Sequence, residues 1–259
     1  MLTVFPVPAF ADNYLWVIHN ETHAIAVDPG DAAPVIGYLK KHRLQLAAVL
    51  VTHHHADHVG GITDLLAWCG QDVPVHGPAD ENIPHRTHLA VSGKNTPIAA
   101  LRLDFAVLAV PGHTLGHVAY YEKNRGLLFC GDTLFGCGCG RLFEGTAVQM
   151  QASLAKLRAL PAATQVFCAH EYTLANLRFA LAVDPDNAAL ARRLASDTAK
   201  RERGDPTLPS TIRLETATNP FMRWDSPMVI QAAMRVSKQT IRATPDQVFG
   251  ALRAWKDRF

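Results

Sequence analysis

A dense cluster of metal-ligand residues limits what this chain can fold into more than any other feature of its sequence. Residues 52–58 read THHHADH, which contains the pattern H-x-H-x-D-H, and they directly follow the apolar run 46–51. Imidazole and carboxylate groups are the ligands of zinc and its first-row neighbours. Alternate side chains of an extended segment share a side, so His53, His55 and Asp57 are predicted to point one way, with His58 beginning the next element. Desolvating so many polar groups is costly unless an ion binds them, and a solvated histidine-rich loop is the alternative.

Three more potential ligands occupy the ends of other apolar runs. His113 follows the run 101–110, Asp132 ends the run 127–132, and His170 follows the run 165–169. Each run is typical of a buried strand, and sheet-based enzymes build their sites where such strands give way to loops. The three residues are therefore predicted to complete the site that residues 53–58 begin.

Seven ligands are too many for one tetrahedral zinc ion and suit a pair of divalent ions. A carboxylate has two oxygens and can bridge ions that lie ~3.5–4 Å apart. Such ions lower the pKa of water from about 15.7 to about 7, which supplies a hydroxide nucleophile at neutral pH. Zinc is favoured, with iron or manganese as alternatives, because geometry and availability select the metal. The expected ligands are His53, His55 and His113 for the first ion, Asp57, His58 and His170 for the second, and Asp132 for both.

Two further histidines and the cysteines are not expected to bind these ions. Alternation turns His54 away from its neighbours, which indicates a structural or solvated role, and His117 is predicted to pack beside the site. The five cysteines are an odd number without framework spacing, which indicates reduced thiols and a cytoplasmic setting. Cys137 and Cys139 are interpreted as incidental members of a glycine-rich loop rather than a metal pair.

The bulk composition is that of an ordinary globular protein. The chain has 259 residues, of which 48% are hydrophobic and 19% charged, and its net charge is +2. This charge predicts no nucleic-acid partner. No apolar run approaches the ~20 residues of a membrane span, and the N-terminus lacks the pattern of a signal peptide.

The predicted secondary structure changes near residue 172. Strand-like runs alternate with loops and helices before it, whereas helical patterns dominate after it. Two domains are predicted from this change. The expected bounds are residues 1–171 for a metal-binding catalytic domain and residues 172–259 for a helical substrate-binding domain.

Several motifs resemble those of a known family. The H-x-H-x-D-H pattern with a later histidine, aspartate and histidine resembles the metallo-β-lactamase superfamily. Longer segments resemble glyoxalase II, the hydroxyacylglutathione hydrolases, and the resemblance covers essentially the whole chain. These segments are THHHADH at 52–58, PGHT at 111–114, GDTLF at 131–135, GCGRLFEGT at 138–146, HEYT at 170–173 and RAWKD at 253–257.

The resemblance implies a fold, a reaction and a set of substrate contacts. The fold would be an αββα metallo-β-lactamase-like sandwich followed by a small helical domain, in a chain expected to be a monomer. The reaction would be hydrolysis of S-D-lactoylglutathione to glutathione and D-lactate, with Asp57 and Asp132 as catalytic residues. Some relatives have tyrosine where this chain has Phe143, which lacks the hydroxyl for a hydrogen bond to glutathione. The implied glutathione contacts are Arg141, Phe143, Tyr172, Arg253 and Lys256.

Two other activities share the metal pattern. A persulfide dioxygenase would use one iron ion and oxygen on a glutathione derivative, and the basic helical C-terminus argues against it. A nuclease of the same superfamily would need a basic groove, which the net charge of +2 does not favour. A non-catalytic zinc protein is disfavoured because structural zinc sites are closed sets of four ligands.

Overall fold

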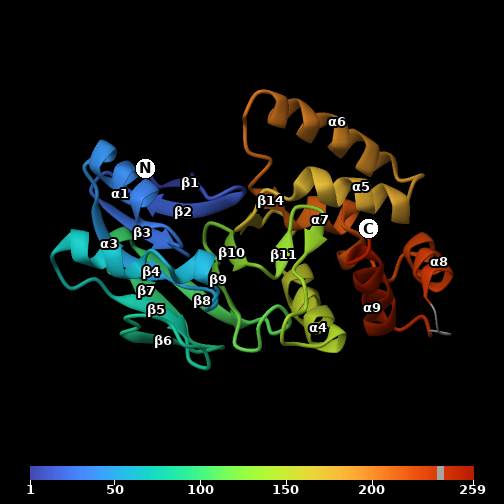
Figure 1. The fold of residues 1–259 in the computed structure, drawn as a ribbon, viewed down its shortest axis with the longest axis horizontal. Coiled ribbons are helices and arrows are strands. Elements are labelled where there is room, and N and C mark those ends of the chain that lie inside the picture. Colours follow the sequence, from blue (N-terminus) through green and yellow to red (C-terminus); the bar gives the residue numbers. More distant parts are fainter. Residues whose placement is uncertain (238–241) are drawn as a thin grey trace. The chain divides into compact units, whose positions relative to one another are not determined.

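The computed structural model describes residues 1–237 and 242–259, and these divide into two compact units (Figure 1). The first unit comprises residues 1–109 and 116–131, and the second comprises residues 110–115 and 132–259. The domain bounds 1–171 and 172–259 stay a prediction. No helix in the described part of the chain is both long enough and apolar enough to cross a membrane.

The first unit contains a mixed sheet that leads into the H-x-H-x-D-H segment. Its first three strands pair antiparallel and the following ones pair parallel. Parallel neighbours need a crossover, which a helix supplies between β3 and β4 and again between β4 and β5. The strands, in their order across the sheet, are β1 Thr3–Ala9, β2 Asn13–His19, β3 His23–Val27, β4 Gln45–Leu50, β5 Val75–Pro78 and β6 His88–Ala90.

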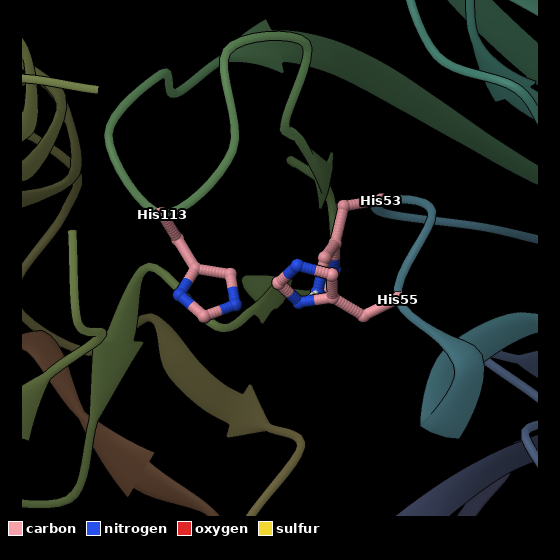
Figure 2. A group of neighbouring side chains, drawn as sticks. All are labelled: His53, His55 and His113. Carbon is pink, nitrogen blue, oxygen red and sulfur yellow. Dashed lines mark hydrogen bonds between the residues drawn. The ribbon is translucent and has the colours of Figure 1, made fainter. Parts of the chain in front are cut away.

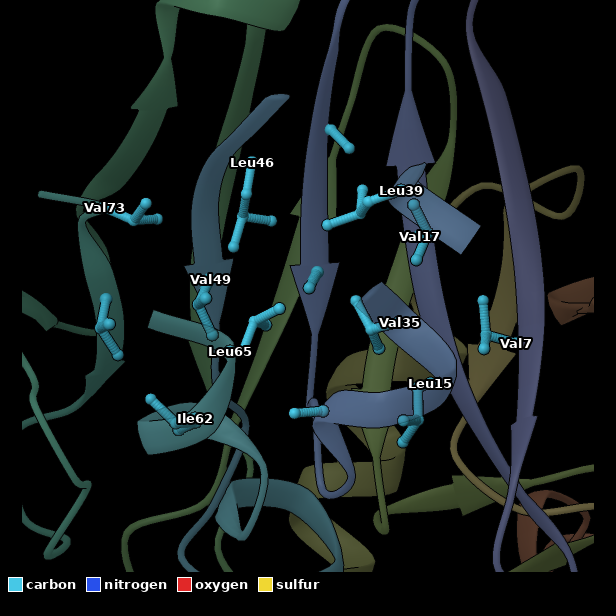
Figure 3. Close-up of a cluster of buried hydrophobic side chains, with 14 of the residues drawn as sticks. Val7, Leu15, Val17, Val35, Leu39, Leu46, Val49, Ile62, Leu65 and Val73 are labelled. Carbon is cyan, nitrogen blue, oxygen red and sulfur yellow. The ribbon is translucent and has the colours of Figure 1, made fainter. Parts of the chain in front are cut away.

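The crossover helices α1 Ala32–His42 and α3 Ile62–Cys69 pack on one face of this sheet (Figures 1 and 3). Asp31 caps α1 by accepting a hydrogen bond from the Ala33 backbone N–H. Val35 and Leu39 of α1 and Ile62 and Leu65 of α3 are fully buried against strand residues. Burying an aliphatic side chain of this size stabilises the fold by roughly 1.5–3 kcal/mol, so this core fixes β4 and the ligand segment that follows it.

A second group of strands in the first unit lies next to β4 and β5. Tyr120, fully buried in β9, shares its one O–H between the Val51 carbonyl at 3.0 Å and the His76 carbonyl at 3.3 Å. Its hydroxyl therefore ties this sheet to the chain just before His53. The antiparallel strands are β7 Asn95–Ile98, β8 Leu103–Ala109, β9 Val118–Glu122 and β10 Leu127–Gly131.

The second unit is largely helical. Its short strands pair as β11 with β12 and β13 with β14. A buried polar network joins two of its helices, because the Arg193 guanidinium lies 2.7 Å from Glu215 and 3.3 Å from Asp197. The elements are β11 Leu134–Phe135, β12 Gly138–Cys139, α4 Ala147–Arg158, β13 Gln165–Cys168, α5 Thr173–Val183, α6 Ala188–Glu202, β14 Ser210–Thr211, α7 Ile212–Thr218, α8 Pro227–Val236 and α9 Pro245–Lys256.

A buried histidine in the first sheet makes the fold sensitive to acid. Burial, helped by the nearby His88 ring, lowers the pKa of His76 from 6.5 to about 4. The folded chain then binds fewer protons than the unfolded chain below pH 6.5, so stability is lost as the pH falls from 6.5 toward 4. Because solvent screens part of this effect, the histidine should cost roughly 1 kcal/mol of unfolding free energy between pH 7 and pH 5.

Urea unfolding at both pH values checks this expectation. His76→Gln should show a smaller loss than the unchanged chain, and the exposed control His42→Gln should show the same loss. Equal losses in all three proteins would contradict it.

Candidate metal centre

The first unit places His53 and His55 in the loop after β4 with their rings together (Figure 2). His53 Nε2 lies 3.1 Å from His55 Nδ1, and the ring of His53 is fully buried. Both side chains come from the extended segment, as the alternation predicted. They form the first pair of potential ligands.

Asp57 and His58 form a second pair, but not in the predicted way. The helix α2 Ala56–Val59 begins directly after His55, so Asp57 belongs to a helical turn and not to the extended segment. The expectation that Asp57 alternates with His53 was wrong, because two-residue periodicity ends where a helix begins. The helical turn instead brings Asp57 Oδ2 within 3.5 Å of His58 Nε2, while Asn13 donates a 3.0 Å hydrogen bond to the same carboxylate oxygen.

Asp28 supports His58 and was missed in the sequence. Its carboxylate accepts hydrogen bonds of 2.7 Å from both the backbone N–H and the hydroxyl of Thr52, and it lies 3.1 Å from His58 Nδ1. A carboxylate that accepts a hydrogen bond from one ring nitrogen orients the imidazole. The other ring nitrogen is then free to bind an ion. The sequence does contain a sign of this role. Asp28 directly follows the apolar run 24–27, just as other site residues follow apolar runs.

The two remaining histidines of this region lie beside the ligand pairs. His54 turns away, as expected, and its Nδ1 lies 3.0 Å from a buried Glu81 carboxylate oxygen. His117 is fully buried and stacks on His53, with ring centroids 4.6 Å apart and an interplanar angle of 18°. His117 therefore packs against the ligand loop, while Glu81 holds His54 within it.

The second unit gathers His113, Asp132 and His170 around one carboxylate. One oxygen of Asp132 lies 3.3 Å from His113 Nε2, and the other lies 3.4 Å from His170 Nε2. The Arg141 carbonyl lies 2.9 Å from His113 Nδ1, which leaves Nε2 as the nitrogen directed at Asp132. Asp132 follows β10 directly, and the two histidines follow β8 and β13, as the positions at strand ends predicted. His113 is the third residue drawn in Figure 2.

The spacing of these atoms fits divalent metal ions. Ligand atoms ~2.0–2.1 Å from a tetrahedral ion lie about 3.3 Å from each other. The four separations described above, two in each unit, range from 3.1 to 3.5 Å. The donors are imidazoles and carboxylates, the ligand types of zinc and its neighbours. These histidine and aspartate residues are therefore suited to hold divalent metal ions.

A cavity of about 710 Å³ opens within the second unit. Its volume falls in the ordinary range of ~300–1,000 Å³ for small-molecule sites. The glutathione contacts implied by the resemblance all line it, and so do Arg178 and Asn176, which the sequence did not single out. The implied residues that line the cavity are Arg141, Phe143, Tyr172, Arg253 and Lys256, beside His113 and Asp132.

The two basic residues of α9 differ in their surroundings. Arg253 is buried, donates a 3.1 Å hydrogen bond to the Cys139 carbonyl, and contacts Asp257 at 2.8 Å. The Lys256 ammonium lies over the rings of Phe179 and Phe259, at 5.2 and 6.0 Å from their centroids. Burial and the neighbouring Arg253 cation lower the pKa of Lys256. Arg253 therefore anchors α9 to the glycine-rich loop, while Lys256 leaves its donors directed at the cavity.

The two aromatic residues of the cavity contact metal-ligand rings. Tyr172 stacks on His170 with centroids 4.8 Å apart and an angle of 7°, and it caps α5. Phe143 is 64% exposed and meets the His113 ring edge-on at 5.2 Å. These contacts place the aromatic wall of the cavity next to His113 and His170.

Comparisons with known proteins identify the family. The family model described as the metallo-β-lactamase superfamily matches residues 10–170, and the one described as hydroxyacylglutathione hydrolase C-terminus matches residues 171–259. A hydroxyacylglutathione hydrolase of Nitrosomonas europaea is 51% identical over 259 residues, which cover all of this chain and 97% of that protein. One of Pseudomonas aeruginosa strain LESB58 is 53% identical over 263 residues and both chains are covered in full.

Solved structures share the fold at lower identity. The BLEG-1 B3 metallo-β-lactamase has a TM-score of 0.64 at 24% identity, over 86% of this chain and all of that one. ETHE1 from Myxococcus xanthus has a TM-score of 0.64 at 22% identity, over 99% of this chain and 98% of that one. The predicted fold class, an αββα metallo-β-lactamase-like sandwich followed by a helical part, is thus confirmed. The chain belongs to the metallo-β-lactamase superfamily and, within it, to the hydroxyacylglutathione hydrolases.

Proposed function

We propose that this chain hydrolyses the thioester of S-D-lactoylglutathione to glutathione and D-lactate with two divalent metal ions. The observation that carries the proposal is the position of Asp132. Its two oxygens face different histidines, and it lines the same cavity as Arg141, Arg253 and Lys256. A carboxylate able to bridge two ions thus lies beside a basic cavity of suitable size for an anionic tripeptide. The names of the full-length relatives support the same substrate class.

The ligands divide between the two ions according to the pairs described above. His53 with His55 would hold one ion and Asp57 with His58 the other, and Asp132 could contribute to both. When bound, the ions supply Lewis acidity and lower the pKa of a coordinated water toward neutrality. Zinc is the proposed occupant, with iron or manganese as alternatives. The proposed groups are His53, His55 and His113 for one ion and Asp57, His58 and His170 for the other.

The chain's own residues orient the ligands and the substrate. Asp28 and the Arg141 carbonyl fix the rings of His58 and His113, and Asn13 fixes the Asp57 carboxylate. The cations of the cavity bind the carboxylates of glutathione and so position its thioester. A thiolate with a free pKa near ~8.5 leaves without much protonation, so the reaction does not require an additional general acid.

The match of residues 171–259 to the hydroxyacylglutathione hydrolase C-terminus favours this reaction over persulfide oxidation or nucleic-acid cleavage. We further propose that the chain acts as a monomer, since the residues that line the cavity all belong to one unit of a single chain. A cytoplasmic setting is proposed because all five cysteines are free thiols.

A direct assay tests the proposal. The purified chain is given S-D-lactoylglutathione, and D-lactate, free thiol and dissolved oxygen are followed together. Equal amounts of D-lactate and thiol without oxygen uptake are expected. Oxygen uptake with glutathione persulfide, in the absence of thioester hydrolysis, would instead favour the dioxygenase.

Lys256→Met is expected to weaken substrate binding with little effect on chemistry. Its ammonium faces the cavity, so its loss removes an interaction shared by the bound substrate and the transition state. KM for S-D-lactoylglutathione should rise about tenfold, the equivalent of roughly 1.4 kcal/mol, while kcat stays within about twofold. Lys123→Met, at an exposed turn, is the matched control and should retain the original KM. A fall in kcat at constant KM would contradict the proposed role.

A further inference from the structure

The α5 wall of the cavity contains one cationic side chain, that of Arg178. Tyr172, Ala175, Asn176 and Arg178 line this wall. Ala175 has no polar side-chain atom, and the Asn176 amide donates its hydrogen bond to the Gly136 carbonyl at 3.0 Å. Arg178 is exposed, and within residues 1–237 and 242–259 no carboxylate lies at ion-pair distance from it. Its five N–H donors are therefore directed at solvent or at a ligand in the cavity.

Other arginines of the same unit are matched with acidic partners. Arg158 pairs with Asp225, Arg223 with Asp184 and Arg253 with Asp257. Holding a long side chain in an ion pair has an entropic cost, and an arginine without a partner avoids that cost until a ligand arrives. Arg178 can thus bind an anionic ligand without first giving up an acidic partner, in contrast to these three.

The cavity has more positive than negative groups. Arg141, Arg178, Arg253 and Lys256 line it, whereas Asp132 is the one acidic residue among the described residues of its lining. Burial and then the Arg253 and Arg141 cations lower the pKa of Lys256, as expected for an ammonium among other cations. A ligand with two separate carboxylates would balance this potential, and glutathione has such a pair, one on its glycine and one on its γ-glutamyl residue.

We infer that Arg178 is a substrate-specificity residue that binds the γ-glutamyl carboxylate of the glutathione moiety. The inference rests on the proposed function, in which the cations of the cavity bind the carboxylates of glutathione, and it assigns the glycine carboxylate to Lys256 of α9. The two carboxylates terminate a three-residue chain that spans up to ~10 Å, so a second cation on a different helix is needed for the other end. Arg178 is the residue of α5 with free donors in the planar arrangement that matches a carboxylate.

A cycle of two enzymes and two substrates tests this assignment. The enzymes are the unchanged chain and Arg178→Gln, and the substrates are S-D-lactoylglutathione and S-D-lactoyl-N-acetylcysteinylglycine. The second substrate keeps the thioester and the glycine carboxylate but lacks the γ-glutamyl residue, and its acetyl group prevents migration of the acyl group to nitrogen. Arg178→Gln should raise KM for the glutathione thioester about threefold to tenfold and leave KM for the truncated thioester unchanged. Its kcat should stay within about twofold on both substrates.

Two controls accompany the cycle. Arg213→Gln, an exposed arginine of α7 outside the cavity, should behave as the unchanged chain on both substrates. Arg178→Lys keeps the charge without the planar arrangement and should recover part of the lost affinity.

The outcomes separate this inference from the proposed function. An Arg178→Gln protein with an unchanged KM, or with the same rise in KM on both substrates, overturns the assignment of Arg178 while the proposed function stands. If the unchanged chain hydrolyses neither thioester, the proposed function fails and this inference fails with it.

Discussion

Asp132→Ala is expected to abolish thioester hydrolysis and to release at least one of the two metal ions. Asp132 directs one oxygen at His113 and the other at His170, so its loss removes a ligand from both ions together. The nucleophilic water then loses its position as well as its lowered pKa. We expect kcat to fall by at least about a thousandfold, which corresponds to about 4 kcal/mol of transition-state stabilisation. Elemental analysis and steady-state kinetics on the same preparation measure both effects.

A substitution of similar shape separates the role of Asp132 as a metal ligand from its role in packing. Asp132→Asn keeps the shape of the side chain but offers one oxygen only, so it should lose activity almost as completely as the alanine variant. Asp186→Asn, at an exposed position in the second unit, should retain both metal and activity. Near-normal turnover of Asp132→Ala with full metal content would show that another residue bridges the ions.

Arg193→Ala is expected to lower the unfolding free energy by about 3–5 kcal/mol. Arg193 is buried between Glu215 and Asp197, at 2.7 and 3.3 Å, and it also donates a 2.6 Å hydrogen bond to the Thr218 hydroxyl. Removing the cation leaves the buried Glu215 carboxylate without its cation and leaves Asp197 with Lys200 alone, which costs much more than losing an exposed ion pair. Urea unfolding of the metal-loaded chain measures the loss, with the exposed substitution Arg213→Ala as the control.

The Arg193 network also contacts the glycine-rich loop beside the cavity, and Glu215 makes this contact. This carboxylate accepts a 2.8 Å hydrogen bond from the Cys137 backbone N–H and a 3.0 Å hydrogen bond from Asn219, whose amide also donates to the Gly138 carbonyl. Arg193→Ala should therefore loosen the glycine-rich loop that leads to Arg141. A loss of stability below about 1 kcal/mol would mean that water or a rearranged side chain replaces the buried cation, against this account.

Four of the candidate ligands could be predicted from the sequence because each lies at or just after the end of an apolar run. His53, His113, Asp132 and His170 lie in loops that directly follow strands, and short loops keep their residues close to the strand end. The spacing within residues 53–58 was also informative, because local geometry links neighbours. The prediction for Asp57 went wrong at the point where the extended segment gives way to α2.

Features that depend on distant segments could not be read from the sequence. Asp28 supports His58 from a position 30 residues earlier, and Glu215 supports Cys137 from a position 78 residues later. Arg253 reads as an exposed basic residue near the end of the chain, yet the structure buries it against the Cys139 carbonyl. Such contacts depend on tertiary packing, which periodicity and residue type do not specify.

Stepwise metal loading tests the central claim most directly. The chain is stripped of metal with a chelator, zinc is added in known molar ratios, and hydrolysis of S-D-lactoylglutathione is measured at each ratio. The account predicts that activity rises until two ions are bound per chain, and that elemental analysis of the fully active protein gives two. Full activity at one ion per chain, with no further change on adding a second, would contradict the two-metal site.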